Sequence, residues 1–162
     1  MERVIIFNML QLLVSLYAVR RGGAPERITA IALVIAALAT YGLQRSFPSR
    51  FYNVEGGVLM IDLALFGVLI AVALHADRWW TLWVAAMQGL GAGAHLVKAL
   101  NPDTLRVVYA ILSAVWSYPI IVLLFLGTVR HCKRVASGSG DLDWSMQGQP
   151  RSAPISRGEH GN

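Results

Sequence analysis

Two titratable side chains, Asp62 and His95, are the residues of this chain best suited to acid–base chemistry or to binding an ion. Each lies within a long apolar segment, where an ionised carboxylate costs about 3 kcal/mol on insertion scales. Because these two segments would cross a membrane in opposite directions, both side chains fall in the half on the side of the N-terminus, here called the outer half. We therefore expect Asp62 to face His95 or Lys98, as a candidate proton-relay or binding pair.

Further polar side chains fall in the same half and repeat at helical spacing. Spacings of three, four or seven residues place side chains on one helix face, and polar faces in lipid turn inward. The sequence thus predicts a polar pocket with the members Asp62, His95, Gln88, Asn8, Gln11, Tyr109, Ser113 and Lys98, close to Thr40, Tyr41 and Gln44. The alternative, which the sequence favours, is structural: these groups hydrogen-bond across helices for about 0.6–2 kcal/mol each.

Gly89 and Gly93 form a GxxxG pattern, typical of close helix packing. Packing within the chain is favoured over packing against a partner. The segment 89–94 also fits a dinucleotide-binding pattern, but no strand precedes it. His75 and His95 lie near opposite membrane faces and cannot share a haem, and Asp62 with His95 supplies only two zinc ligands. No catalytic residue, cofactor or metal is therefore predicted.

The elements that must position these residues are five apolar runs, each free of charge at its centre: Val4–Val19, Ile28–Gln44, Val58–Ala76, Trp79–Val97 and Leu105–Val129. Helical runs of about 17 to 25 residues cover a hydrocarbon core of roughly 30 Å. A 56% hydrophobic and 14% charged composition is far from that of a soluble domain. The prediction is an all-α integral membrane bundle of five transmembrane helices over residues 1–134. A polar, disordered tail is predicted over residues 135–162.

The net charge of +5 comes from basic clusters at the ends of the runs, which indicates membrane anchors rather than a nucleic-acid surface. Their distribution favours an outer N-terminus and a cytoplasmic C-terminus. Trp79, Trp80 and Trp83 are predicted to be an aromatic anchor at the inner interface. The tight Asp77-Arg78 joint predicts antiparallel neighbouring helices, and Pro119 predicts a kink in the fifth.

The blocks RRGGAPER, HADRWWTLW, GAGAHLVKAL and AVWSYP…LGTVRHCKR resemble a group of small, uncharacterised bacterial multi-pass inner-membrane proteins. The resemblance implies a location but no activity, substrate or catalytic residue. The expected function is a non-enzymatic structural, accessory or assembly subunit that docks a larger membrane partner or a second copy of itself within the lipid bilayer. The alternative is a carrier or channel for a small solute, proton or metal ion, and the third is a membrane enzyme.

Overall fold

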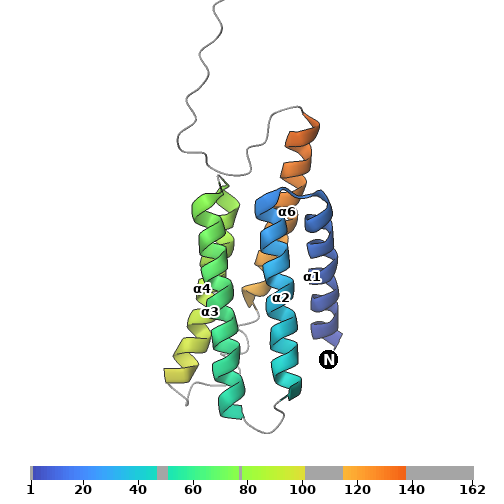
Figure 1. The fold of residues 1–162 in the computed structure, drawn as a ribbon. Helices are drawn as coiled ribbons and strands as arrows, with labels where there is room; N and C mark the ends of the chain where they lie inside the picture. Colours follow the sequence, from blue (N-terminus) through green and yellow to red (C-terminus); the bar gives the residue numbers. More distant parts are fainter. Residues whose placement is uncertain (1, 47–50, 77, 101–114, 138–162) are drawn as a thin grey trace, which may run out of the picture.

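All regular structure in the computed structural model is helical over the residues that it describes, 2–46, 51–76, 78–100 and 115–137 (Figure 1). The helices are α1 (Glu2–Arg21), α2 (Ala24–Ser46), α3 (Phe51–His75), α4 (Trp79–Leu100) and α6 (Ser117–Ala136). The prediction of an all-α helical bundle is therefore confirmed for this part of the chain.

The helices pack side by side, and successive helices run in opposite directions (Figure 1). Each of α1 to α3 contacts the next helix, and α6 contacts both α1 and α4, which closes the ring. The α3–α4 pair makes the most extensive contact, as the short joint at Arg78 predicts. One end of the bundle therefore carries the α1–α2 turn, the α3–α4 joint and the last turns of α6; we call it the basic end.

Helix α6 differs from the predicted fifth span, Leu105–Val129. It begins at Ser117, with Trp116 as its N-cap, and continues through the basic cluster to Ala136. Pro119 therefore lies in the first turn, where its missing N–H leaves no helical hydrogen bond broken. The predicted kink in the fifth span stays a prediction, because the segment that would precede it is not described. Residues 101–114 lie outside the described part of the chain.

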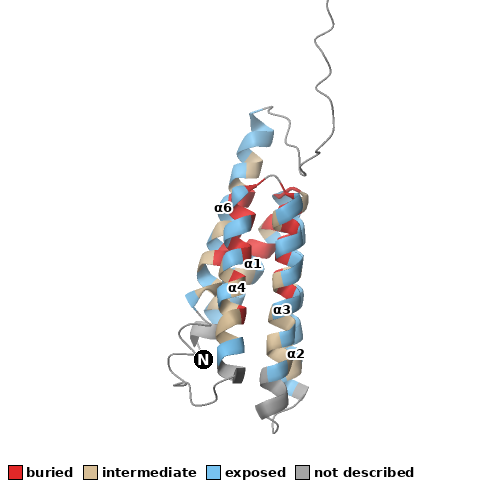
Figure 2. Cartoon of the chain, turned by 90° about the vertical axis from the view of Figure 1, so that its left-hand side faces the viewer, coloured by how far each residue is buried: buried red, intermediate tan, exposed pale blue. Residues whose placement is uncertain are grey.

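The buried side chains gather in the half of the bundle toward the basic end (Figure 2). Leu69 of α3, Val84 of α4 and Leu124 of α6 are almost completely buried there and belong to one apolar core. Trp80 also belongs to this core, against Gly127, where an added Cβ would lie 2.7 Å from the indole. Its predicted role in an interfacial anchor is therefore wrong, whereas Trp79 and Trp83 are exposed.

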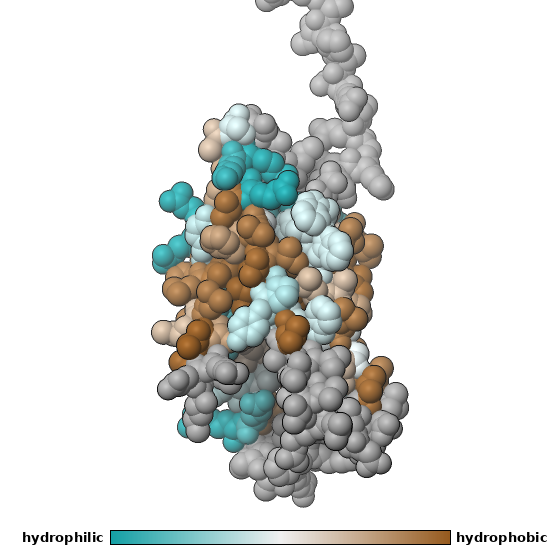
Figure 3. Space-filling model, turned by 180° about the vertical axis from the view of Figure 1, so that it is seen from behind, coloured by the Kyte–Doolittle hydropathy of each residue, from teal (hydrophilic) through white to brown (hydrophobic). Residues whose placement is uncertain are grey.

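The outer surface of the described helices is strongly apolar (Figure 3). Exposed large apolar side chains outnumber buried apolar ones by about two to one in this part of the chain. Two helical segments, Ala24–Arg45 and Gly56–His75, are long and apolar enough to cross a membrane. The prediction of five membrane-spanning helices is therefore not confirmed by the described residues.

Candidate functional site

Asp62, in the fourth turn of α3, is held by two side chains of α4. Gln88 Nε2 donates to Asp62 Oδ1 at 3.1 Å, and His95 Nε2 lies 3.1 Å from Asp62 Oδ2. Gln88 and His95 are seven residues apart, so they lie two turns apart on one face of α4. The expected contact between Asp62 and His95 is thus present. Neither side chain is fully buried, since 23% of Asp62 and 15% of His95 remain exposed.

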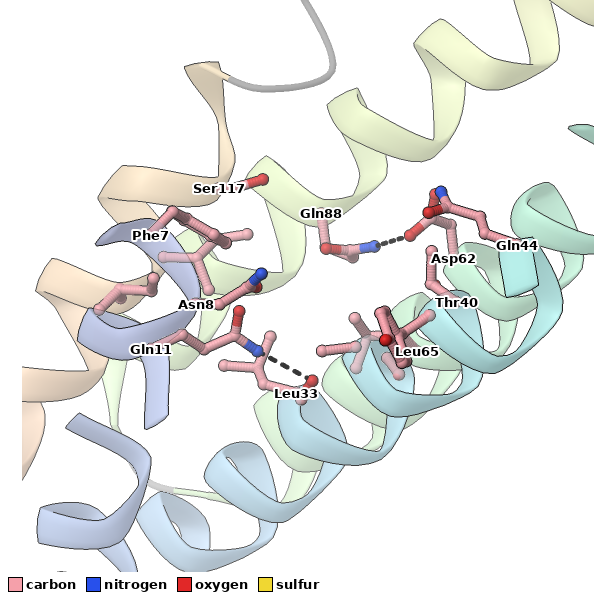
Figure 4. A pocket seen from close by; sticks show the side chains of 15 residues that line it. Phe7, Asn8, Gln11, Leu33, Thr40, Gln44, Asp62, Leu65, Gln88 and Ser117 are labelled. Carbon is pink, nitrogen blue, oxygen red and sulfur yellow. Dashed lines mark hydrogen bonds between the residues drawn. The ribbon is translucent and has the colours of Figure 1, made fainter. Parts of the chain in front are cut away.

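This cluster lies between two neighbouring cavities. The larger has a volume of about 380 Å³, and all five described helices contribute to its wall. The smaller, of about 280 Å³, contains His95 and Trp116 in its wall. Both cavities are lined by Thr40, Asp62, Gln88, Ser117 and Ile120. We call the two cavities together the interhelical pocket, and Asp62 with Gln88 lies where they meet (Figure 4).

A second hydrogen bond joins the wall of the pocket to a backbone group. Gln11 Nε2 of α1 donates to the carbonyl oxygen of Leu33 in α2 at 3.0 Å. Gln11 bonds the Leu33 carbonyl and Gln88 bonds the Asp62 carboxylate, and both of these partners can only accept hydrogen bonds. Each glutamine must therefore direct its NH₂ group toward its partner. The amide oxygens of Gln11 and Gln88 therefore point away from these partners, toward the space between the helices (Figure 4).

The pocket is closed toward the basic end. Leu65 and Ile121 form part of its wall and belong to the apolar core. One turn further along the same helices, Leu69 and Leu124 fill the bundle interior and are each 1% exposed. The buried hydroxyls of Ser15 and Thr29, one turn beyond Gln11 and Leu33, are small polar groups at about the same level of the bundle. The pocket is confined to the half of the bundle that the sequence analysis assigns to the outer side.

Most of the predicted pocket residues that the structure describes come together. Asn8, Gln11, Asp62 and Gln88 line the larger cavity, and His95 lines the smaller one. Tyr109, Ser113 and the side chain of Lys98 lie outside the described residues. The wall also contains Thr40, Tyr41, Gln44 and Ser117. Among the described residues, no three His, Cys, Asp or Glu side chains are grouped as metal ligands.

The two glycines of the GxxxG pattern have different surroundings. A Cβ added at Gly89 would lie 2.8 Å from the ring of Phe66, so this glycine lets α3 and α4 approach closely. A Cβ added at Gly93 would meet no atom within 4 Å in the described structure. Gly89 therefore serves packing within the chain, whereas no described neighbour requires the missing side chain at Gly93.

The sequence analysis missed an ion pair at the basic end, between Glu26 and Arg78. Arg78 Nη1 donates to Glu26 Oε1 at 2.8 Å, and both side chains are buried. Both residues lie in the short connections between apolar runs, and such connections are usually solvated. The available signal was that Glu26 is the one acidic residue in a turn rich in arginine.

No family model, no curated protein and no solved structure matches this chain. Function is therefore argued from the chemistry of the interhelical pocket and from the surface that surrounds it.

Proposed function

We propose that the chain is a multi-pass protein of a bacterial inner membrane, with five membrane-crossing helices, an outer N-terminus and a cytoplasmic C-terminus. The apolar outer surface supports this proposal, because water would leave so many large apolar side chains unfavourably exposed. Helix α1 illustrates the point: its exposed residues include Ile6, Leu13 and Leu16, whereas its polar Gln11 and Ser15 face inward. The polar residues of this helix therefore leave its outward-facing side apolar.

The basic end supports the proposed orientation. Its exposed side chains include six cations from three helices: Arg20, Arg21, Arg27, Arg130, Lys133 and Arg134. Basic side chains are enriched on the cytoplasmic side of inner-membrane proteins, where they meet anionic lipid headgroups. Under this proposal the interhelical pocket opens toward the outer side, and the buried Glu26–Arg78 pair lies toward the cytoplasm.

Within this membrane protein, the function that the geometry supports best is that of a carrier for a small solute or ion. One observation carries the proposal: a cavity of about 380 Å³ whose wall holds an acidic side chain and several amides and hydroxyls. Interhelical bonding accounts for Asp62, Gln88 and His95, which meet across α3 and α4, but it does not require a cavity beside them. A pocket open in one half and closed by apolar packing in the other is the arrangement expected for one state of alternating access.

The proposal is tested with purified protein in liposomes that enclose a pH-sensitive dye, scanned with a panel of small solutes and ions. A carrier produces a flux that Asp62→Asn and His95→Ala abolish while both variants still insert. His75→Gln is the matched control, because His75 is an exposed histidine that contacts the backbone of its own helix, outside the pocket. Solute flux that is equal in wild type, Asp62→Asn and His95→Ala would contradict the proposal.

The second candidate is the accessory or assembly subunit that the sequence alone favours. The observation in its favour is Gly93 of α4, where an added Cβ meets no described atom within 4 Å. Such a position permits the close approach of a helix from a larger partner or from a second copy. A subunit of this kind co-purifies with its partner in mild detergent and tolerates Asp62→Asn and His95→Ala.

A further inference from the structure

We propose that the interhelical pocket selects a small organic cation, namely a protonated primary amine with a short apolar body, which binds at Asp62. This inference rests on the proposed function of the pocket and adds the chemical class of its cargo. Three features of the wall carry it: the sign of its charge, the direction of its amide groups and the position of its apolar side chains.

The described wall of the pocket contains one carboxyl group, that of Asp62. Among the described residues in its wall, Asp62 is the one whose side chain is ordinarily ionised at neutral pH, and no arginine or lysine is among them. The other titratable groups that face it are His95 from α4 and Tyr41 from α2. A carboxylate within a helix bundle attracts a cation more strongly than it would in water, because the surroundings screen the charge less. An anionic cargo would instead meet like charge.

Two of the four amide side chains in the wall, those of Gln11 and Gln88, present acceptors to the cavity. Gln11 commits an N–H to the Leu33 carbonyl and Gln88 commits one to Asp62, which leaves both amide oxygens on the cavity side (Figure 4). A carboxylate has about four acceptor positions, and Gln88 and His95 occupy two of them. An ammonium group has three donors and no acceptor, so it suits a wall that offers oxygen lone pairs.

The side of the cavity toward the core is apolar. Leu33, Leu65, Ile120 and Ile121 face the larger cavity, and Phe7 of α1 adds an aromatic ring. An alkyl chain attached to the ammonium group would contact these side chains and be stabilised by the burial of each methylene. The wall is therefore amphipathic, which fits an amine with a short hydrocarbon body better than a bare metal ion.

The test uses three probes of similar shape and different charge: n-butylammonium, butan-1-ol and butyrate. Each is titrated into full-length protein in lipid nanodiscs, with heat of binding and tryptophan fluorescence as the two readouts. Trp116 lies in the wall of the smaller cavity, and a Trp116→Phe variant shows which part of the fluorescence change arises there. We expect n-butylammonium to bind about tenfold or more tightly than butan-1-ol, and butyrate to bind most weakly.

Three variants assign the binding to Asp62. Asp62→Asn should weaken binding of n-butylammonium by about tenfold or more and abolish its preference over butan-1-ol. Asp62→Glu, which keeps the charge, should retain the preference, and His75→Gln should bind like wild type. A helical circular-dichroism spectrum equal to that of wild type shows that each variant is folded.

The outcomes separate this inference from the proposed function. Equal binding of all three probes, or tighter binding of butan-1-ol or butyrate, overturns the cation specificity but leaves a functional pocket. Binding of n-butylammonium that is unchanged in Asp62→Asn overturns the assignment to Asp62. If none of the probes binds and no solute flux depends on Asp62, both the inference and the carrier proposal fail.

Discussion

Arg78 donates a hydrogen bond from Nη1 to Oε1 of Glu26 at 2.8 Å, and their side chains are 2% and 0% exposed. The pair joins the first turn of α2 to the joint between α3 and α4. Arg78 also has its Nη2 atom 3.5 Å from Nδ1 of His131 in α6. Three parts of the chain are thus connected at the basic end, which holds this end of the bundle closed.

Glu26→Gln should therefore destabilise the bundle strongly. A buried guanidinium deprived of its counter-charge costs about 3–5 kcal/mol, while replacement of both partners by apolar residues is often close to neutral. We expect Glu26→Gln to lower the free energy of unfolding by about that amount. The double variant Glu26→Leu with Arg78→Met should recover most of the loss.

Unfolding by sodium dodecyl sulfate in mixed micelles, followed by circular dichroism, measures these changes. Arg20→Gln is the control, because Arg20 is exposed at the same end and its replacement should change stability by no more than about 0.5 kcal/mol. A Glu26→Gln protein as stable as wild type would show that the buried pair does not hold this end together.

Two glycines give opposite predictions for the same substitution. Gly127→Ala places a Cβ 2.7 Å from the buried Trp80 indole, so α6 and α4 must separate slightly, at a cost of about 1–3 kcal/mol. Gly93→Ala meets no described atom within 4 Å and gains helix propensity, which favours folding by about 0.5–1 kcal/mol. Thermal unfolding in detergent distinguishes the two variants. Equal stabilities would contradict the contact between Gly127 and Trp80.

The tryptophans that follow the α3–α4 joint should also differ from one another. Trp80 is 5% exposed in the core, so Trp80→Ala should remove about 3–5 kcal/mol from the free energy of unfolding. Trp83 is 54% exposed, and Trp83→Ala should have a much smaller effect. Detergent unfolding curves of the two variants provide the comparison. A greater loss for Trp83→Ala would restore the interfacial interpretation of all three tryptophans.

These tryptophans illustrate how far the sequence predicts the fold. The apolar runs and the short connections predict the helices and their neighbours, because each run is long enough and its ends are charged. Composition does not indicate which of three adjacent tryptophans faces inward. Which tryptophan is buried depends on the facing helix α6, where Gly127 leaves room for Trp80.

The pocket was predictable to a similar extent. Helical spacing and antiparallel direction place Asp62 and His95 at one depth, and the structure places them 3.1 Å apart. Spacing does not indicate whether polar groups meet or leave a cavity between them, since that depends on the distance between helices. The sequence analysis missed the Glu26–Arg78 pair because charged side chains in short connections are ordinarily expected to be exposed to solvent. In the structure, both side chains of this pair are buried at the basic end.

The single cysteine allows a direct test of the proposed arrangement in a membrane. Cys132 lies at the basic end, where its Sγ atom is 3.4 Å from the carbonyl oxygen of Arg21. Ser117 lies in the wall of the pocket, toward the other end. Labelling with a membrane-impermeant maleimide in sealed right-side-out and inside-out vesicles compares Cys132 with a Ser117→Cys variant in a Cys132→Ser background. The account predicts that Cys132 is labelled only from the cytoplasmic face and the residue-117 thiol only from the outer face; labelling of both from one face would contradict it.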